Sequence, residues 1–145
     1  MKLSTILGSG LFAVALAAPL EARIDAQEFD VSDFTAGCVP HGSLCSISFK
    51  VATNQMPFQT DCTFSGLGGG SIPDVPFTAC ADPSIVWSFR GVTVGSGPSQ
   101  FYELALATAD ENLALSTFFP ASDFPRINDG SSFHQTFTGN PRFVV

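Results

Sequence analysis

The sequence predicts an all-β protein: a compact antiparallel β-barrel or β-sandwich of about seven to eight strands with two disulfides. Short stretches in which apolar and polar residues alternate recur along the chain, as expected for strands with one buried face. The chain has 13 glycines and 10 prolines, which are spread along it and separate these stretches from one another. No long stretch has apolar residues at i, i+3, i+4 and i+7, the spacing of a helix. Its 4 cysteines can form two disulfides, which are frequent in small secreted domains.

The chain begins with the features of a secretory leader. A short basic start precedes residues 3–16 (LSTILGSGLFAVAL), which are almost all apolar or small, and Ala-Leu-Ala at 15–17 fits the small-x-small cleavage pattern. The apolar run is shorter than the about 20 residues of a membrane-spanning helix. We therefore expect a signal peptide over residues 1–17, cleaved after residue 17 or 18, and a secreted, extracellular protein without a membrane anchor.

Residues 28–145 are expected to form a single β domain, preceded by a short polar segment over residues 18–27. A domain of this length buries about two-thirds of the surface that its unfolded chain exposes, so it can form one core. Whether residues 18–23 are a processed pro-segment is left open, because a single arginine at its end is weak evidence for processing.

The composition is acidic, with 6 lysines and arginines against 13 aspartates and glutamates, and a formal net charge of −7. Removal of the leader takes away Lys2, the only charged residue within it, and leaves a net charge of −8. The remaining basic residues are scattered along the chain, so no patch could neutralise several phosphates. We therefore expect neither nucleic-acid binding nor docking on an anionic membrane.

The clearest strand is residues 45–51 (CSISFKV), where apolar side chains at every second position would share one face. Residues 28–36 (EFDVSDFTA) are a plausible hairpin partner for it, across a turn that contains Pro-His-Gly. The other expected strands are 84–91 (SIVWSFRG), 101–107 (FYELALA), 113–119 (LALSTFF), 133–137 (FHQTF) and 142–145 (RFVV). Turn residues separate these runs at 54–57, 66–76, 95–98, 110–112, 128–130 and 139–141.

The chain has 15 phenylalanines, one of them in the leader, and most of the others must fill the core. Trp87 alternates with Ile85 and Phe89, so we place it in the core rather than on a surface where a sugar could stack on it.

The favoured disulfides are Cys38–Cys45 and Cys62–Cys80, because the members of each pair flank a turn-rich segment that returns on itself. The nested and crossed pairings of the same cysteines remain open alternatives. On the chain-entropy estimate, closing loops of these sizes stabilises the fold by about 2.5 to 3 kcal/mol each.

The first of these pairs brackets a candidate recognition loop. If Cys38 and Cys45 pair, the two strands are tied at the mouth of a hairpin, and Pro40, His41 and Gly42 are carried exposed at its tip.

A metal site is a minor alternative. Cys38, His41 and Cys45 are residue types that bind zinc, but structural zinc needs four ligands, usually as two close pairs, and the other two cysteines are far apart in the sequence. Calcium could use four carboxylates in the expected loops, those of Asp110, Glu111, Asp123 and Asp129. None of them lies in a DxDxDG-type segment. We expect no metal and no cofactor.

An enzyme is the other minor alternative. The sequence lacks a Gly-x-Ser-x-Gly segment, and paired cysteines cannot act as thiol nucleophiles. Small acidic guanyl-specific ribonucleases of fungi use two histidines, a glutamate, an arginine and a tyrosine, and this chain has residues of these types: His41, Arg90, Tyr102, Glu103 and His134. In that family the glutamate precedes the arginine and a long helix packs on the sheet, which this sequence does not match. His134 alternates with Phe133 on its expected strand, so its side chain is expected to point to solvent.

Several cysteine-flanked blocks resemble a known group of proteins. DFTAGCVPHGSLCSISFKV (33–51), TDCTF (60–64), TACADPSIVWSF (78–89) and TFTGNPRFVV (136–145) are similar to small secreted fungal β-barrel proteins. These are the Alternaria-major-allergen-like and hypersensitive-response-inducing elicitor proteins, and the resemblance extends over about residues 28–145.

The resemblance implies release from a fungus and action on, or recognition by, a plant or animal host. Such proteins are described as effectors, elicitors or allergens, mostly without an established enzymatic site. For the allergen of this group, the resemblance implies a dimer whose two chains are linked by a disulfide through an extra cysteine near the N-terminus. Here, in contrast, all 4 cysteines can pair internally. We therefore expect a monomer or a weak non-covalent dimer.

The expected function is that of a secreted, non-enzymatic effector or elicitor that binds a host protein or cell-surface component. One alternative is an extracellular binding module for a wall glycan or a small apolar ligand. Another is a small secreted hydrolase such as a ribonuclease.

Overall fold

The computed structural model describes residues 28–56, 58–130 and 132–145. The expected signal peptide (1–17) and polar segment (18–27) lie outside the described residues. The described chain forms ten strands and one short 3-10 helix: β1 (Phe29–Cys38), β2 (Leu44–Thr53), β3 (Thr60–Leu67), β4 (Val75–Ala79), β5 (Ile85–Val92), β6 (Phe101–Thr108), β7 (Ala114–Pro120), η1 (Ala121–Asp123), β8 (Arg126–Asn128), β9 (Phe133–Gln135) and β10 (Phe143–Val144). The predicted all-β class is confirmed.

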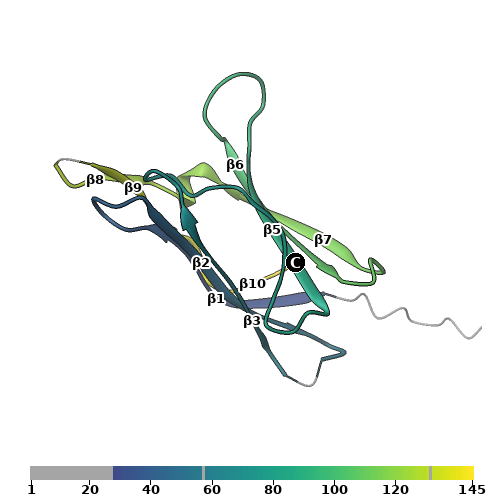
Figure 1. The fold of residues 1–145 in the computed structure, drawn as a ribbon. Helices are drawn as coiled ribbons and strands as arrows, with labels where there is room; N and C mark the ends of the chain where they lie inside the picture. The colour runs from purple at the N-terminus through teal and green to yellow at the C-terminus, as the bar shows by residue number, and fades with distance from the viewer. Residues whose placement is uncertain (1–27, 57, 131) are drawn as a thin grey trace, which may run out of the picture.

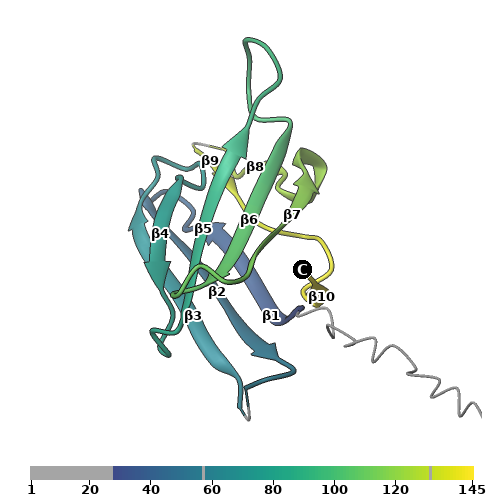
Figure 2. The ribbon, with the colours of Figure 1, turned by 90° about the vertical axis from the view of Figure 1, so that its right-hand side faces the viewer.

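The strands form two four-stranded antiparallel sheets and one small hairpin. The first sheet has the order β10-β1-β2-β3, the second has the order β4-β5-β6-β7, and β8 pairs with β9. The two large sheets lie face to face, with the β8–β9 hairpin at one end of them (Figures 1 and 2). Of the two architectures that the sequence left open, the structure is a sandwich.

The structure has more strands than the seven or eight that the sequence predicts. The strands without a counterpart among the expected segments are β3, β4 and β8, whereas β9 and β10 lie within the expected strands 133–137 and 142–145. β8 has only three residues, too few for alternation to be visible, and β3 and β4 overlap the two ends of the segment 66–76 that the sequence predicts as a turn.

One aromatic core fills the space between the sheets. From the first sheet, Phe34 and Phe49 are buried, and from the second sheet Trp87 and Phe89 are buried. The ring centroids of Phe49 and Trp87 lie 5.0 Å apart, and those of Phe34 and Phe89 lie 6.5 Å apart, so aromatic contacts join the two layers. The prediction that Trp87 belongs to the core is confirmed.

A bulge in β1 changes the phase of its buried face. Phe29 and Val31 are buried, and after the register shift between Ser32 and Thr35 the buried positions continue at Phe34. Asp33 takes a left-handed conformation there (φ 54°), which inserts the extra residue. The bulge thereby keeps both halves of β1 packed on the core.

The two disulfides have different places in the sandwich. Cys38 and Cys45 are directly opposite each other on β1 and β2, so their bond lies within one hairpin. Cys62 on β3 pairs with Cys80, which follows β4, so this bond joins the first sheet to the second. These are the two pairs that the sequence favoured, and the nested and crossed alternatives do not occur.

Candidate functional site

We define the stapled turn as residues 39–43 together with the Cys38–Cys45 disulfide that closes them. Its three expected recognition residues, Pro40, His41 and Gly42, are all exposed at the end of the β1–β2 hairpin. The two half-cystines beneath them are buried. The structure therefore places a rigid covalent link directly below an exposed turn.

The main chain of the stapled turn is tightly folded. His41 has a left-handed conformation (φ 57°), which is uncommon for a residue with a side chain. The Gly42 N–H donates to the Val39 carbonyl oxygen at 3.2 Å, and a Cβ on Gly42 would lie 2.4 Å from Val39 Cγ2. A larger residue at position 42 would therefore displace the Val39 side chain.

His41 is also tied to a part of the chain that is distant in sequence. Its main-chain N–H donates to Ser132 Oγ at 3.2 Å, and its Nδ1 lies 3.4 Å from the same oxygen. Its Nε2 lies 3.2 Å from Asp129 Oδ2, while Ser132 Oγ donates to Asp129 Oδ1 at 3.2 Å. The loop between β8 and β9 thus holds the stapled turn through both the main chain and the imidazole ring of His41.

The second histidine lies beside the same carboxylate. His134 Nδ1 is 3.8 Å from Asp129 Oδ2, and the His134 side chain is only 12% exposed. The expectation that His134 points to solvent is wrong. Strand alternation does place His134 on the opposite face from the buried Gln135, but on that face its ring lies beside Asp129, and Phe133 is the exposed residue of the strand. We call His41, Asp129, Ser132 and His134 the His–Asp cluster.

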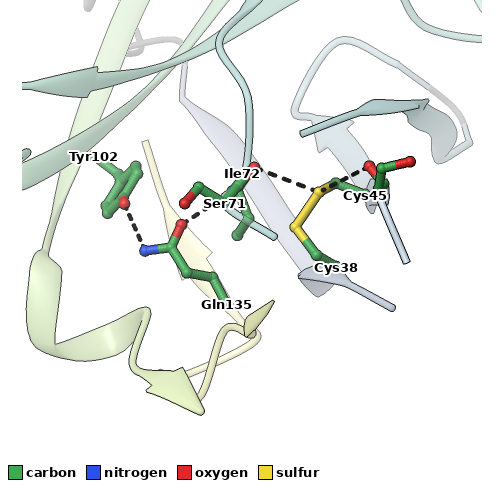
Figure 3. The surroundings of a disulfide bond; sticks show 7 residues. Cys38, Cys45, Ser71, Ile72, Tyr102 and Gln135 are labelled. Carbon is green, nitrogen blue, oxygen red and sulfur yellow. Dashed lines mark hydrogen bonds between the residues drawn. A yellow bond between two sulfur atoms is a disulfide. The ribbon is translucent and has the colours of Figure 1, made fainter. Parts of the chain in front are cut away.

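A buried amide anchors the base of this region. Gln135 is 7% exposed, its Oε1 accepts the Ile72 N–H at 3.0 Å, and its Nε2 donates to the Tyr102 hydroxyl at 2.9 Å and to the Phe124 carbonyl oxygen at 3.3 Å. Figure 3 shows the amide between Ile72 and Tyr102. A buried amide with partners on both its oxygen and its nitrogen fixes the position of its strand.

The segment 68–72 connects this anchor to the disulfide. The Gly70 carbonyl oxygen accepts the Gln135 N–H at 2.9 Å, and the Ser71 carbonyl oxygen lies 3.4 Å from Cys45 Sγ (Figure 3). Gly68 passes so close that a Cβ there would lie 2.4 Å from the same sulfur atom. The main chain at Gly68 therefore packs against the disulfide so closely that only glycine fits there.

The His–Asp cluster contains the three residue types of a serine-hydrolase triad, and His41 lies between the other two, with Nδ1 3.4 Å from Ser132 Oγ and Nε2 3.2 Å from Asp129 Oδ2. A nucleophilic serine must pass its proton to a histidine whose other nitrogen is held by the acid. Ser132 Oγ, however, donates to Asp129 Oδ1 itself at 3.2 Å, and it also accepts the main-chain N–H of His41. Its hydroxyl is thus engaged in closing the turn, so the arrangement favours a structural clasp over a nucleophile.

The residues considered for a ribonuclease lie in two separate places. His41 and His134 meet at Asp129, whereas Arg90 and Glu103 pair with each other on β5 and β6. Tyr102 is buried, with its hydroxyl bonded to the Gln135 amide. The structure therefore does not bring the set together into one cleft.

The residues considered for metal binding are engaged in other ways. Cys38 and Cys45 are consumed by their disulfide, so the zinc alternative is wrong. Asp129 contacts the histidines, and Asp110 accepts hydrogen bonds within its own turn. Among residues 28–56, 58–130 and 132–145 there is no group of three or more histidine, cysteine, aspartate or glutamate side chains arranged to hold a metal ion.

Sequence reasoning missed the roles of Asp129, Ser132 and Gln135. Their contacts join residues about 90, 60 and 30 positions apart, which no periodic pattern can reveal. The only available signal was Asn128-Asp129-Gly130, which predicted a turn but not its partner.

Comparison of the chain with protein-family models, with curated proteins and with solved structures found no match. In the part of the chain that the structure describes, no helix has the length and apolar character needed to cross a membrane.

Proposed function

We propose that the protein is a secreted, non-enzymatic effector or elicitor that a host protein or cell-surface component recognises through the stapled turn. The observation that carries the proposal is that an exposed turn is held by a disulfide and by a side chain 91 positions further along the chain. Residues 39–43 are all exposed, and the contacts of His41 with Ser132 and Asp129 lie outside the core to which Cys38 and Cys45 belong.

A rigid exposed turn is suited to recognition because its conformational entropy has already been lost on folding. A partner that binds it does not have to order it, which raises affinity without any new contact. His41 and Gly42 also border a shallow hollow of about 480 Å³, together with Arg126 and Phe133. The Arg126 guanidinium lies 5.7 Å from the Phe133 ring centroid, and arginine and aromatic residues are frequent in the energetically dominant parts of interfaces.

The extracellular setting is supported by three independent features. Two disulfides are typical of oxidising compartments. The first residues have the pattern of a secretory leader, and the cysteine-flanked blocks resemble those of secreted fungal elicitors. The net charge of −7 disfavours nucleic acid and anionic membranes as partners and leaves proteins and glycans of the host surface.

Infiltration of the mature, oxidised protein into leaf tissue tests the proposal, with ion leakage and the oxidative burst as readouts. The wild type is expected to provoke a dose-dependent response. His41→Ala removes the side chain at the centre of the stapled turn and is expected to lower potency by about tenfold or more, as expected for a dominant interface residue.

The matched control is Glu111→Ala, which removes a side chain from another hairpin turn at a similar positive φ (62°). It is expected to keep full potency, and circular dichroism would verify that both variants are folded. Equal potency of His41→Ala and wild type would contradict recognition through the stapled turn. Cleavage of RNA by the wild type that both His41→Ala and His134→Ala abolish would replace the proposed function by a ribonuclease.

A further inference from the structure

The outer face of the second sheet carries a groove of about 560 Å³ over β4, β5 and β6. Ser88 on β5 and Ala105 on β6 are paired in register and form its floor. Their neighbours in the strands, such as Trp87 and Leu104, are buried, so Ser88 and Ala105 point away from the core. Small side chains at both positions leave the floor open. We call this feature the outer groove.

A bulge builds one wall of the outer groove. The ladder between β4 and β5 shifts register between Val75 and Thr78, so Pro76 and Phe77 together lie opposite the single residue Ser88. Bulges of this kind re-aim side chains. Phe77 is 61% exposed and lines the groove instead of packing in the core.

The other end of the outer groove is polar. Arg90 and Glu103 are directly opposite each other on β5 and β6, and Arg90 Nε donates to Glu103 Oε2. The Glu103 side chain is 12% exposed and the Arg90 side chain is 65% exposed. Within the described part of the chain, Glu103 Oε1 and the two terminal nitrogens of Arg90 make no hydrogen bond, so they are available to a ligand. Asp74, also at this end, accepts the Gly91 N–H at 2.8 Å.

The same face continues beyond the groove onto β7. Phe118 lies opposite Glu103, and Ser116 lies opposite Ala105. Phe118 is 56% exposed. Neighbouring strands are about 4.8 Å apart, so β4 and β7 are separated by about 14 Å across the sheet. Two exposed aromatic rings therefore flank a polar centre over a length that fits a few sugar rings joined end to end.

We propose that the outer groove binds a neutral oligosaccharide. The C–H face of a pyranose ring matches the negative face of an aromatic ring, here Phe77, and the sugar hydroxyls match the donors of Arg90 and the acceptor oxygen of Glu103. An apolar ligand would bury this ion pair without replacing its contacts with water. An anionic chain would approach Asp74 and a protein of net charge −7. Trp87, buried in the core, takes no part.

This inference does not rest on the proposed function, because the groove and the stapled turn share no residue. The test is a titration of 15N-labelled protein, followed by amide shifts, with five probes. Three are neutral hexasaccharides (of β-1,3-glucose, β-1,4-glucose and N-acetylglucosamine), one is hexagalacturonate and one is laurate. At least one neutral probe is expected to bind and to shift the amides of Phe77, Ser88, Arg90 and Glu103.

Phe77→Ala is expected to weaken that binding by about tenfold, because it removes the stacking surface. Phe58→Ala is the matched control, since Phe58 is equally exposed (60% against 61%) and lies outside the groove, and it is expected to bind as the wild type does. His41→Ala should also bind the sugar normally, which separates this inference from the proposed function.

Binding of a neutral probe that Phe77→Ala leaves unchanged would overturn the proposal. So would binding of hexagalacturonate or laurate alone, or no binding of any neutral probe at millimolar concentration.

Discussion

Two hairpin turns of equal length, residues 39–43 and 109–113, are held in contrasting ways. Each contains one non-glycine residue at positive φ, His41 (57°) in the first and Glu111 (62°) in the second. In both, a main-chain hydrogen bond of 2.9 Å closes the ladder at the mouth of the turn. The main chains are thus closed alike, and the difference lies in the side chains.

The turn at 109–113 is held mainly by its own and adjoining residues, with one further main-chain hydrogen bond from the Ala109 N–H to the Ser84 carbonyl oxygen at 2.8 Å. Asp110 accepts hydrogen bonds from the Asn112 N–H (3.2 Å) and the Asn112 side-chain amide (2.7 Å), and Thr108 Oγ1 accepts the Leu113 N–H at 3.1 Å. A hydrogen bond from the Thr108 side chain, followed by that from the Asn112 N–H, lowers the pKa of the Asp110 carboxyl below its ordinary value.

The stapled turn is held by residues outside it. Its disulfide lies below the turn, and its main-chain and imidazole nitrogens contact Ser132 and Asp129. The turn at 109–113 has local hydrogen bonds and one main-chain contact to Ser84, so the stapled turn, with a disulfide and side-chain contacts to two distant residues, has more constraints than this hairpin of equal length. The proposed recognition of residues 39–43 by a host partner would account for these additional constraints.

The largest effect on stability is expected from removal of the Cys38–Cys45 disulfide, which is the main difference between the two turns. Cys38→Ser with Cys45→Ser is expected to lower the free energy of unfolding by about 2.5 kcal/mol, because the unfolded chain regains the entropy of the closed loop. Denaturant unfolding of oxidised protein measures it. An unchanged denaturation midpoint would show that the hairpin register alone already fixes the turn.

The next largest effect on stability is expected from loss of the buried Gln135 amide below the turn. Gln135→Met removes the partner of the Ile72 N–H and of the Tyr102 hydroxyl in a buried site, and should cost about 2 kcal/mol of unfolding free energy. Gln59→Met, at an exposed glutamine, is the control and should change the stability little. Equal stability of the two variants would contradict the anchoring role.

Ser132→Ala would make the stapled turn resemble the other turn more closely. It removes the acceptor of the His41 N–H and should lower the unfolding free energy by about 0.5–1 kcal/mol, since the contact is exposed. Hydrogen exchange of the His41 amide should become faster, while exchange at Glu111 should not change. Ser96→Ala in the exposed β5–β6 loop is the control. Unaltered exchange at His41 would mean that the clasp does not hold the turn.

The smallest effect is expected at the locally held turn and concerns acid. Because the pKa of Asp110 is lowered in the folded protein, its contribution to stability is present above the ordinary carboxyl pKa of 3.8 and is lost as the pH falls through the lowered value. Asp110→Asn should therefore reduce the loss of stability below about pH 4. Unfolding curves at a series of acidic pH values measure this. An identical acid dependence in wild type and variant would contradict it.

A second aspartate should behave in the same way. The Ser84 main-chain N–H, followed by the Ser84 side chain, lowers the pKa of Asp82, so Asp82→Asn should have an effect of the same sign.

Much of the fold could be predicted because its long strands alternate. The buried faces of β2, β5 and β6 follow period two over at least five residues, and the turns between them contain glycine, proline or aspartate. The pairing of Cys38 with Cys45 could also be favoured, because a Pro-His-Gly turn between them brings the chain back on itself.

The remaining features depend on contacts without a local signature. The bulges at Asp33 and at Phe77 shift the phase of two strands, so alternation fails at the residues that the bulges re-aim. The position of His134 beside Asp129 lies on a three-residue strand that carries too little pattern to predict it. The clasp between His41 and Asp129 joins segments that meet only in the folded sandwich.

The most direct test of the proposed role of the stapled turn is the potency of Cys38→Ser with Cys45→Ser in leaf tissue, at a temperature where circular dichroism shows the variant to be folded. If the fixed conformation of the turn is what the host recognises, the folded variant should lose most of its potency, while Asp110→Asn keeps that of the wild type. Full potency of the folded, disulfide-free variant would contradict the proposal.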